Sequence, residues 1–544
     1  MAIQGHTRRQ PADSSAGGDV RGERVISGLT SRGKLLAPLA LGAVAVLAFA
    51  PFGLFPLMPL TLAALFRLAE NKRPQRAFLL GWLFGVGEFA FGVYWIYISI
   101  HLIGGADIWL AVGMLALLVA AMGVFSATVL WAAAYLAPAR SWRRYLVALP
   151  ALWALIEWVR SWILSGFPWL AAGYSQTDSP LAGFGPIAGV FGISWTVALT
   201  AGLLVLIVSP PTGRGRMGAI FEARNRSPKS ARRMLALAAL ILVWTLGFWV
   251  RAVNWTHPAG PPLKVSLIQG NIEQSIKWNP AAFATSLTRY RQLTLAHLDS
   301  DLIIWPETAV PAWLRDVAAD YLLPLADRVV AHGGQLVLGV PVYRSGDAYN
   351  AVVLLNGQRP QFYFKEHLVP FGEYFPGPDW FRAWLKSRGL PYSSFTPGDP
   401  DQRPLDLGRW RAAVAICYED AFGAQLIRML PEANLLIEVS DDAWFGDSIA
   451  LPQHLQIARM RAIEAGRYML RATNTGITAI IGPDGAVRQR LPIDQVGVLT
   501  AKVTPFAGAT PYAMAGGNLP LVFALLGILF AATIAAIYRP ERDE

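Results

Sequence analysis

Long apolar segments recur along this 544-residue chain, and they limit its possible folds more than any other feature. A stretch of about 17–25 apolar residues can cross the hydrocarbon core of a bilayer as a helix. Hydrophobic residues make up 54% of the chain and charged residues 15%, which is too apolar for a water-soluble protein of this length. We therefore expect a polytopic α-helical membrane bundle of about eight spans, near residues 35–51, 53–69, 77–100, 108–136, 145–164, 182–209, 234–252 and 518–538.

Basic residues mark alternate loops between these predicted spans. Lys and Arg in short loops are retained on the cytoplasmic side of a membrane. The loops after the second, fourth and sixth spans are basic, whereas residues 101–107 and 165–180 contain no Lys or Arg. This pattern predicts cytoplasmic N- and C-termini and an external segment after the seventh span. These loops and anionic lipid headgroups explain the net charge of +11, so we expect no nucleic-acid partner.

The texture of the sequence changes between about residues 263 and 503, where short β-type runs alternate with helical stretches. This alternation indicates an α/β domain. We expect helices near 281–298, 317–332 and 453–465. The expected strands lie near residues 264–269, 302–305, 336–340, 351–355, 412–416, 435–439 and 478–481.

Four regions follow from these patterns. Residues 1–33 form a basic tail that we expect to be disordered and cytoplasmic, and residues 34–255 form a membrane domain of seven helices. Residues 256–510 form the α/β domain, and residues 511–544 form the last membrane helix with a short cytoplasmic tail. The sequence contains neither a metal-type His/Cys cluster nor a Gly-rich phosphate loop, so we expect no metal and no cofactor.

Three polar residues of the α/β domain stand at the ends of short apolar or aromatic runs, where strands are expected to end. Glu307 ends an apolar run through Pro306, Lys365 follows an aromatic pair, and Cys417 follows Ile416. Each alone is typical of a surface charge at a strand end, and a lone buried cysteine is typical of a small core residue. Together they indicate chemistry, because a carboxylate can take the thiol proton and an ammonium can stabilise both the thiolate and a developing oxyanion.

Several strings around these residues carry a family resemblance. They are WPET (residues 305–308), FKEHLVPFGEY (364–374), CYED (417–420), QGNIEQSIKW (269–278), DAWFGDS (442–448), RATNTGI (471–477) and GFPW (166–169). With their spacing, the chain resembles the nitrilase or carbon-nitrogen hydrolase superfamily and, more narrowly, the bacterial apolipoprotein N-acyltransferase family. The resemblance covers nearly the whole chain outside the N-terminal tail, and it implies a nitrilase-like αββα sandwich in the α/β domain.

The resemblance also implies a role for individual residues. It makes Glu307 the general base, Lys365 the oxyanion partner and Cys417 the nucleophile of a catalytic triad. The supporting residues would be Glu373, Tyr418 and Glu419, and the substrate-binding residues would be Trp278, Trp380 and Trp444. Simple aromatic packing is an equal alternative for Trp278 and Tyr418, and an ordinary salt bridge is the less favoured alternative for Glu373 and Glu419. One position departs from the family pattern, because Asp441 stands where we expect Asn.

The reaction that the resemblance implies has two steps. A phospholipid, typically phosphatidylethanolamine, donates an acyl chain to Cys417 as a thioester, and the α-amine at the N-terminus of a diacylglyceryl-modified apolipoprotein then accepts it. The resemblance places such a protein in the bacterial inner membrane, as a multi-pass monomer with a periplasmic catalytic domain. We also expect the aromatic segment 375–395, including Trp380 and Trp384, to act as a lid that dips into the membrane interface.

Two other functions remain open at this stage. A membrane-tethered amidase would use the same triad to hydrolyse small amides. A transporter or membrane scaffold would need an intramembrane polar relay, for which Glu157 and Arg160 are candidates. Because these two residues lie one helical turn apart, we interpret them instead as an ion pair on one helix near the interface.

Overall fold

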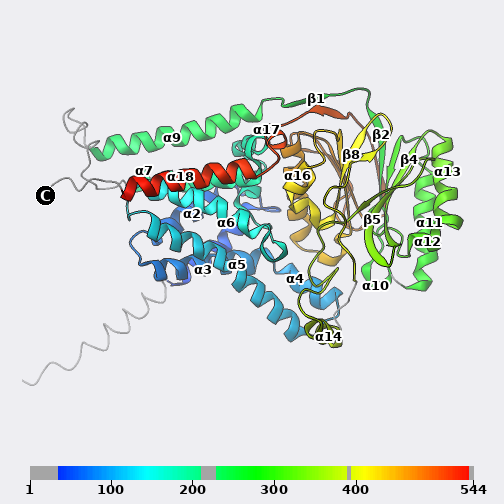
Figure 1. Cartoon of the computed structure of the whole chain (residues 1–544), viewed down its shortest axis with the longest axis horizontal. Helices are drawn as coiled ribbons and strands as arrows, with labels where there is room; N and C mark the ends of the chain where they lie inside the picture. Colours follow the sequence, from blue (N-terminus) through cyan, green and yellow to red (C-terminus); the bar gives the residue numbers. More distant parts are fainter. Residues whose placement is uncertain (1–34, 210–227, 278, 389–393, 538–544) are drawn as a thin grey trace, which may run out of the picture.

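The computed structural model describes residues 35–209, 228–277, 279–388 and 394–537. It consists of a helical bundle and an α/β part placed end to end (Figure 1). The predicted tail of residues 1–33 lies outside the described residues. The main helices of the bundle are a first helix at Leu35–Ala48, α2 (Leu57–Leu68), α3 (Pro74–Gly92), α5 (Ile108–Leu136), α6 (Leu149–Arg160), α7 (Gly185–Val208), α9 (Pro228–Arg251) and α18 (Leu519–Ile537).

Every predicted span is largely helical in this bundle, but the count of eight crossings is not confirmed. Within the described residues, three helical segments are long and apolar enough to cross a membrane, namely Ile108–Leu136, Pro180–Val208 and Ser230–Arg251. The α3 helix and the segment Trp95–Ile103 would make a fourth if this pair, bent by 52°, is one span. The eight-span arrangement therefore stays a prediction.

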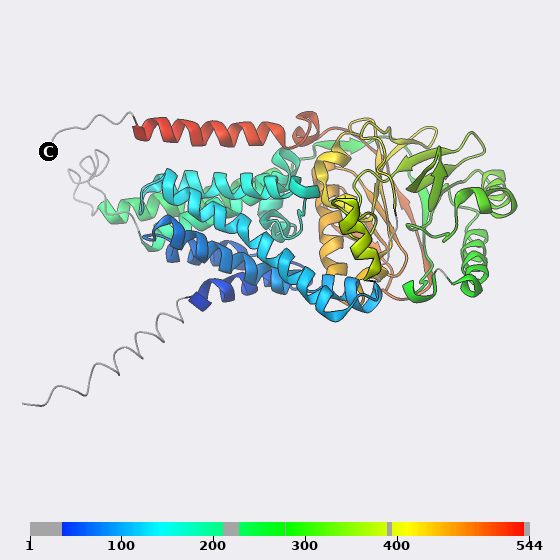
Figure 2. The same ribbon diagram turned by 60° about the horizontal axis from the view of Figure 1, so that its bottom comes forward.

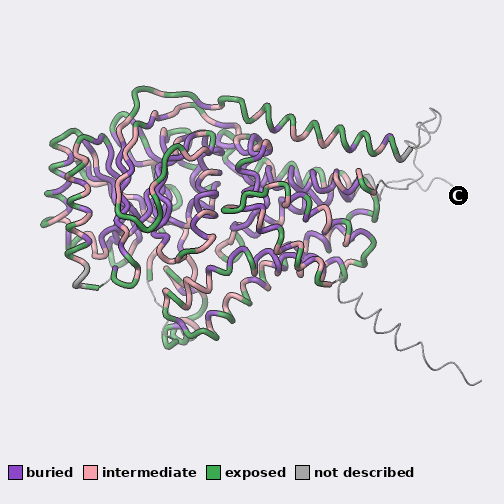
Figure 3. The backbone as a smooth tube through the Cα atoms, turned by 180° about the vertical axis from the view of Figure 1, so that it is seen from behind, coloured by how far each residue is buried: buried purple, intermediate pink, exposed green. Residues whose placement is uncertain are grey.

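Exposed apolar side chains support a lipid environment for the bundle. The α9 helix is exposed along most of its length (Figure 3), and Leu242 and Phe248 on it are 65% and 60% exposed. A helix with so much exposed apolar surface is stable next to lipid and unfavourable in water.

The α/β part contains two six-stranded sheets and a two-stranded ribbon. The strand order is β13-β2-β3-β4-β5-β6 in one sheet and β12-β11-β10-β9-β8-β7 in the other. The ribbon pairs β1 (Thr256–Pro258) with β14 (Phe506–Gly508). The strands of the sheets are β2 (Leu263–Gln269), β3 (Leu302–Ile304), β4 (Gln335–Arg344), β5 (Asp347–Leu355), β6 (Gln361–Phe364), β7 (Leu405–Asp406), β8 (Arg411–Ile416), β9 (Leu435–Ser440), β10 (Met469–Thr473), β11 (Ala479–Ile481), β12 (Val487–Arg490) and β13 (Gly497–Val503).

The two sheets pack face to face between layers of helices, which gives the expected αββα order. Apolar side chains from both sheets, such as Leu267 and Val414, share one buried core. Helices α11 (Pro280–Leu295) and α13 (Leu323–Ala331) cover the outer face of the first sheet. Helix α16 (Ala450–Ala465) covers the second sheet and lies between it and the bundle (Figure 2). All seven predicted strands are present, and the predicted helix 317–332 is interrupted by a π-helical turn at Ala318–Leu322.

Helix α16 attaches the α/β part to the bundle through buried polar contacts. The Arg461 guanidinium pairs with Glu464 at 3.0 Å, and Glu464 also accepts a 2.7 Å hydrogen bond from the backbone N–H of Val190 in α7. The indole N–H of Trp169 donates to Gln453 Oε1 at 2.8 Å. Since these polar groups pair with one another inside an apolar contact, they favour one orientation of the two parts.

Candidate active site

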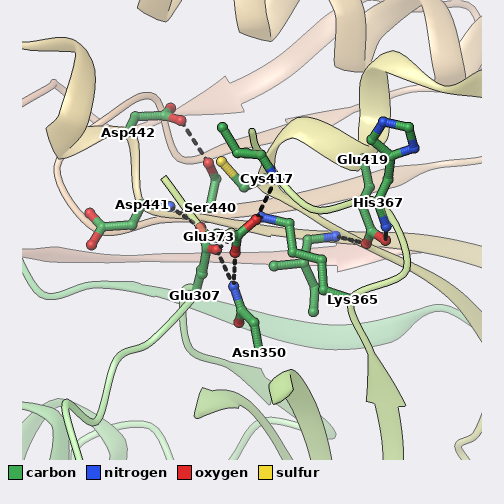
Figure 4. Close-up of polar contacts among 12 residues, drawn as sticks. Glu307, Asn350, Lys365, His367, Glu373, Cys417, Glu419, Ser440, Asp441 and Asp442 are labelled. Atoms are coloured by element: carbon green, nitrogen blue, oxygen red, sulfur yellow. Dashed lines mark hydrogen bonds and ion pairs between the residues drawn. The ribbon is translucent and has the colours of Figure 1, made fainter. Parts of the chain in front are cut away.

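The three predicted catalytic residues come from both sheets. Glu307 follows β3, and Lys365 follows β6 of the same sheet; Cys417 follows β8 of the facing sheet. The strands therefore end with these side chains at one edge of the sandwich, where they face one another (Figure 4). Close approach of β4 to the Glu307 loop needs a glycine, because a Cβ at Gly339 would lie 2.6 Å from the Glu307 Cα.

The Glu307 carboxylate is buried and held by three donors. Its Oε1 accepts from the Asn350 amide at 2.7 Å and lies 3.5 Å from the Lys365 ammonium. Its Oε2 accepts from the backbone N–H of Asp441 at 2.9 Å. These contacts fix the direction of the carboxylate, as a general base requires.

Lys365 is almost fully buried and shares two carboxylates. Its ammonium lies 2.9 Å from Glu373 Oε2 and 3.5 Å from Glu307 Oε1. Burial alone would lower the pKa of Lys365, but the charges of Glu373 and Glu307 outweigh burial and raise it above its usual value. Asn350 also donates to Glu373 Oε1 at 2.8 Å, so one amide joins both carboxylates. The lysine is a permanent cation at this site.

Cys417 occupies a strained turn at the end of β8. Its φ of +54° lies in the left-handed region, which is costly for a residue with a side chain. Burial and the neighbouring Glu307 carboxylate raise the pKa of the thiol well above its usual value, and Lys365 and a hydrogen bond with Ser440 partly oppose that shift. The resting thiol is therefore protonated, and it needs a base to react.

Glu419 links the Cys417 turn to the loop that carries Lys365. Its Oε2 accepts from the backbone N–H of Ile416 at 2.8 Å, and its Oε1 accepts from the backbone N–H groups of Glu366 at 2.7 Å and His367 at 3.0 Å. Burial raises the pKa of Glu419 to about 7, although these hydrogen bonds oppose the shift. Its role in the structure is to connect the two loops, which is more than the ordinary salt bridge considered from the sequence.

A buried network of ionisable residues lies beneath Cys417. His454 Nδ1 lies 2.9 Å from Asp442 Oδ1, and its Nε2 lies 3.2 Å from Asp420 Oδ1 and 3.4 Å from the Cys417 carbonyl oxygen. Burial and Arg471 act to lower the pKa of His454, but Asp420 and Asp442 raise it to about 10, so the imidazole is cationic at neutral pH. Asp442 accepts a 2.6 Å hydrogen bond from Ser440, which connects this network to the thiol.

Three residues of this network are spaced as metal ligands would be, but their carboxylates already pair with a cationic side chain. Asp420, Glu438 and His454 are close enough to share a metal ion. However, Arg471 pairs with Glu438, lies 2.7 Å from Asp442 Oδ2 and lies 3.8 Å from Asp420 Oδ2. Because the Arg471 guanidinium and the His454 imidazolium already pair with these carboxylates, we interpret the group as an internal ion network.

A loop of the bundle lies beside Cys417 and Tyr418. Tyr418 donates through its hydroxyl to the Gly166 carbonyl at 3.1 Å, and its ring stacks against Trp169 with centroids 6.4 Å apart. Arg160 supports this loop, because it donates to the Trp169 carbonyl at 2.6 Å. Glu157 instead accepts from the Trp153 indole at 2.8 Å. The ion pair that we expected between Glu157 and Arg160 is not among those of the described residues.

The three tryptophans predicted to bind substrate differ in their environments. Trp278 lies outside the described residues. Trp380 is 73% exposed on helix α14 (Asp379–Ser387), which packs against the bundle through buried Leu385. The Trp444 carbonyl accepts a 2.6 Å hydrogen bond from Ser99 of the bundle. Among the contacts of the described residues, neither tryptophan reaches the Cys417 thiol, so their substrate-binding roles stay predictions.

Two residues of the site were not predicted from the sequence. Asn350 is the one amide within the apolar strand β5, and His454 lies on a helix whose side chains are mostly buried. A polar residue inside an apolar pattern is a signal that a buried partner is needed. Both positions show this signal in the sequence, but the sequence does not reveal which residue is the buried partner.

The fold and the site together define the class of protein, and comparisons with known proteins agree with it. Residues 264–512 match the carbon-nitrogen hydrolase family model, and residues 41–203 match the model of the apolipoprotein N-acyltransferase N-terminal domain. The chain therefore carries a carbon-nitrogen hydrolase domain joined to an apolar helical bundle.

Relatives of similar length narrow this class to one family. The apolipoprotein N-acyltransferase of Methylococcus capsulatus is 43% identical over 91% of this chain and 96% of its own length. That of Nitrosomonas europaea is 42% identical over 94% and 98%. A solved carbon-nitrogen hydrolase superfamily protein of Xanthomonas campestris covers 48% of this chain and 97% of its own length, with a TM-score of 0.34 and 18% identity. The chain belongs to the apolipoprotein N-acyltransferase family.

Proposed function

We propose that this protein transfers a fatty acyl chain from a membrane phospholipid to the N-terminal α-amino group of diacylglyceryl-modified apolipoproteins. The observation that carries the proposal is the meeting of Glu307, Lys365 and Cys417 beside a loop of the apolar bundle. A thiol, a base and a buried cation together suit acyl transfer through a thioester. Phosphatidylethanolamine is the proposed donor, and the protein is proposed to act as a monomer.

In the first step, the Cys417 sulfur attacks the ester carbonyl of the phospholipid while Glu307 takes the thiol proton. The negative charge that develops on the carbonyl oxygen faces the Lys365 ammonium. The ester C–O bond then breaks, and the leaving lysophospholipid oxygen takes the proton from Glu307. The products are a Cys417 thioester and a lysophospholipid.

In the second step, the α-amine of the lipoprotein attacks the thioester carbonyl. Glu307 takes a proton from the amine, the C–S bond breaks, and the proton returns to the Cys417 thiolate. An amide is formed and the enzyme is restored. The acyl chains stay in the bilayer throughout, which avoids moving them into water at a cost of about 0.8 kcal/mol per CH₂.

The proposal also includes a location in the cell. We propose the bacterial inner membrane, with the α/β domain in the periplasm and both termini in the cytoplasm, because the basic loops alternate along the sequence. The domain limits at residues 34, 256 and 511 and the lid role of segment 375–395 belong to the same proposal. Sequence identity above 40% to acyltransferases over nearly the whole chain favours this function over amide hydrolysis.

Complementation tests the proposed function. The gene is expressed in a bacterial strain depleted of its own lipoprotein N-acyltransferase, and the N-terminal peptide of an abundant lipoprotein is measured by mass spectrometry. We expect the wild-type chain to restore the triacylated peptide and Cys417→Ala to leave it diacylated. Correctly inserted wild-type protein that leaves the peptide diacylated would overturn the proposal.

A further inference from the structure

Lys277 is a buried ammonium that the proposed mechanism does not use. It ends helix α10 (Gln274–Lys277), directly before Trp278, and its side chain is 3% exposed. The ammonium pairs with the carboxylate of Asp441 and lies 3.5 Å from the backbone carbonyl oxygen of Glu307. Burying two charges costs free energy. We therefore looked for a role of the Lys277–Asp441 pair next to Glu307.

Asp441 connects this pair to the base. Its backbone N–H donates to Glu307 Oε2 at 2.9 Å, while its Oδ1 accepts from the Asn474 amide at 3.0 Å. Asn474 in turn donates to the Ile272 carbonyl at 2.7 Å and accepts from the Ile272 N–H at 3.0 Å. The segment before Trp278 is thereby fixed against the same backbone that holds Glu307.

The charges around Glu307 explain why the pair matters. Glu307 faces the Lys365 ammonium, the Glu373 carboxylate across Asn350, and the Cys417 thiol. The Lys277–Asp441 pair adds one positive and one negative charge. If Lys277 were neutral, Asp441 would remain as an unpaired buried carboxylate beside Glu307, and mutual repulsion would favour a proton on one of them. A protonated Glu307 cannot take the thiol proton.

We propose that Lys277 and Asp441 are a positioning pair, which keeps the Glu307 carboxylate available as a base and fixes the segment that leads to Trp278. This inference rests on the proposed function. The family pattern led us to expect Asn at position 441, where no charge would need balancing. In this chain position 441 carries a negative charge, and Lys277 balances it.

A rescue experiment tests this inference. Purified protein is mixed with phospholipid, and the rate of acyl-enzyme formation on Cys417 is followed by intact mass across a range of pH. We expect Lys277→Met to slow acylation by about 30-fold at pH 7 and to shift its pH profile upward, because an unpaired charge perturbs its buried neighbour. Asp441→Asn alone leaves the Lys277 ammonium without its carboxylate and should slow acylation by about 5-fold, which is less than for Lys277→Met because a nearby positive charge does not favour a proton on Glu307. The double variant of Asp441→Asn and Lys277→Met should react about 10-fold faster than Lys277→Met alone.

If the pair acts through its charges, removing the second charge should restore part of the acylation rate. If it acted only by packing, the second substitution would lower the rate further. If Lys277→Met does not fold, Lys277→Gln with and without Asp441→Asn makes the same comparison. A double variant no faster than the lysine variant, or a lysine variant as fast as wild type, would overturn the inference while leaving the proposed function intact. Wild-type protein without any acyl-enzyme would instead overturn the proposed function.

Discussion

Cys417 depends on its neighbours for reactivity, because its own surroundings disfavour the thiolate. Burial and the Glu307 carboxylate raise the pKa of the thiol, while Lys365 lowers it. In the proposed mechanism Glu307 therefore has two opposing effects on the thiol. Its charge disfavours a resting thiolate, whereas its carboxylate accepts the thiol proton as the sulfur attacks.

Glu307→Gln should separate these two effects. Removing the negative charge lowers the pKa of Cys417, so alkylation by iodoacetamide at pH 8 should become faster. Acyl transfer should fall by at least about 100-fold, since the base is lost. Lys365→Met should slow both reactions, because it removes the cation that favours the thiolate. Both rates are measured on purified protein, and Cys417 is the only cysteine.

Glu366→Gln is the matched control for these variants. Glu366 follows Lys365 directly, but it pairs with Arg428 at the surface. Its replacement should leave alkylation and acyl transfer close to the wild-type rates. Slower alkylation of Glu307→Gln than of wild type would show that the carboxylate does not act on the thiol as described.

At the residue scale, the sequence predicted which residues stand at the ends of strands, but not which distant residues would contact them. Glu307, Lys365 and Cys417 follow apolar runs, and that pattern is visible without a structure. Asn350 donates to Glu307, which is 43 residues away in sequence, and His454 lies beside the carbonyl of Cys417, which is 37 residues away. Contacts between segments so distant in sequence depend on sheet order and register, which hydrophobic patterns do not encode.

At the scale of elements, strand β4 packs closely against the proposed base, Glu307, at Gly339. A Cβ at Gly339 would lie 2.5 Å from the Pro306 carbonyl oxygen and 2.6 Å from the Glu307 Cα, so backbone must move to admit it. We expect Gly339→Ala to lower acyl transfer at least about 10-fold by shifting Glu307, since small displacements of catalytic groups are costly. The protein should still insert into the membrane.

The control for that variant is Gly497→Ala on β13 of the same sheet. A Cβ there would approach no side-chain atom closer than 3.4 Å, which is an ordinary contact. Acyl transfer is measured for both variants at equal amounts of inserted protein. Equal activity of Gly339→Ala and wild type would contradict the assigned role of β4.

His367 makes the contact between the Lys365 loop and the bundle sensitive to pH. Its Nε2–H donates to the Ser165 carbonyl at 2.6 Å, and burial, aided by Lys365, lowers its pKa from 6.5 to about 4. The unfolded chain thus binds a proton at higher pH than the folded protein does. The stability that neutral His367 contributes is complete above about pH 6.5 and is lost as the pH falls towards 4.

Thermal unfolding in detergent tests this dependence. Between pH 7.5 and 5.5, the unfolding temperature of the wild type should fall more than that of His367→Gln, which keeps an N–H donor but does not titrate. His332→Gln, at an exposed position after α13, should behave like the wild type. Equal pH sensitivity of His367→Gln and wild type would exclude His367 as the source.

Element prediction succeeded where the local pattern was strong. The buried strands β3, β8 and β9 read as apolar runs, and all three were predicted. The missed strand β12 is mostly exposed and contains two arginines, so no apolar run identifies it. Strand β10 was missed because Arg471 interrupts its apolar pattern, and only the buried ion network explains that arginine.

At the scale of the whole molecule, helix α16 joins the helical bundle to the α/β part, which the sequence patterns identified as separate regions. One face of it supports the second sheet, and the other packs against α7 of the bundle. The active-site loops thereby lie beside the bundle loop that carries Gly166 and Trp169. This arrangement suits a reaction between substrates whose acyl chains remain in a bilayer.

Topology gives a prediction at the same scale. In a Cys417→Ala background, Gln358→Cys is placed on an exposed turn of the α/β part and Lys72→Cys on an exposed turn of the bundle. A membrane-impermeant maleimide should label Gln358→Cys in intact spheroplasts and Lys72→Cys only after permeabilisation. The reverse pattern would contradict the periplasmic position of the α/β domain.

The central claim is that Cys417 carries a fatty acyl group, and intact-protein mass spectrometry tests it most directly. Protein incubated with phosphatidylethanolamine and no lipoprotein should gain the mass of one fatty acyl chain. Hydroxylamine should remove the adduct, a diacylated lipoprotein should discharge it, and Cys417→Ala should not form it. A fully inserted wild-type protein without such an adduct, or an adduct that persists in Cys417→Ala, would contradict the account.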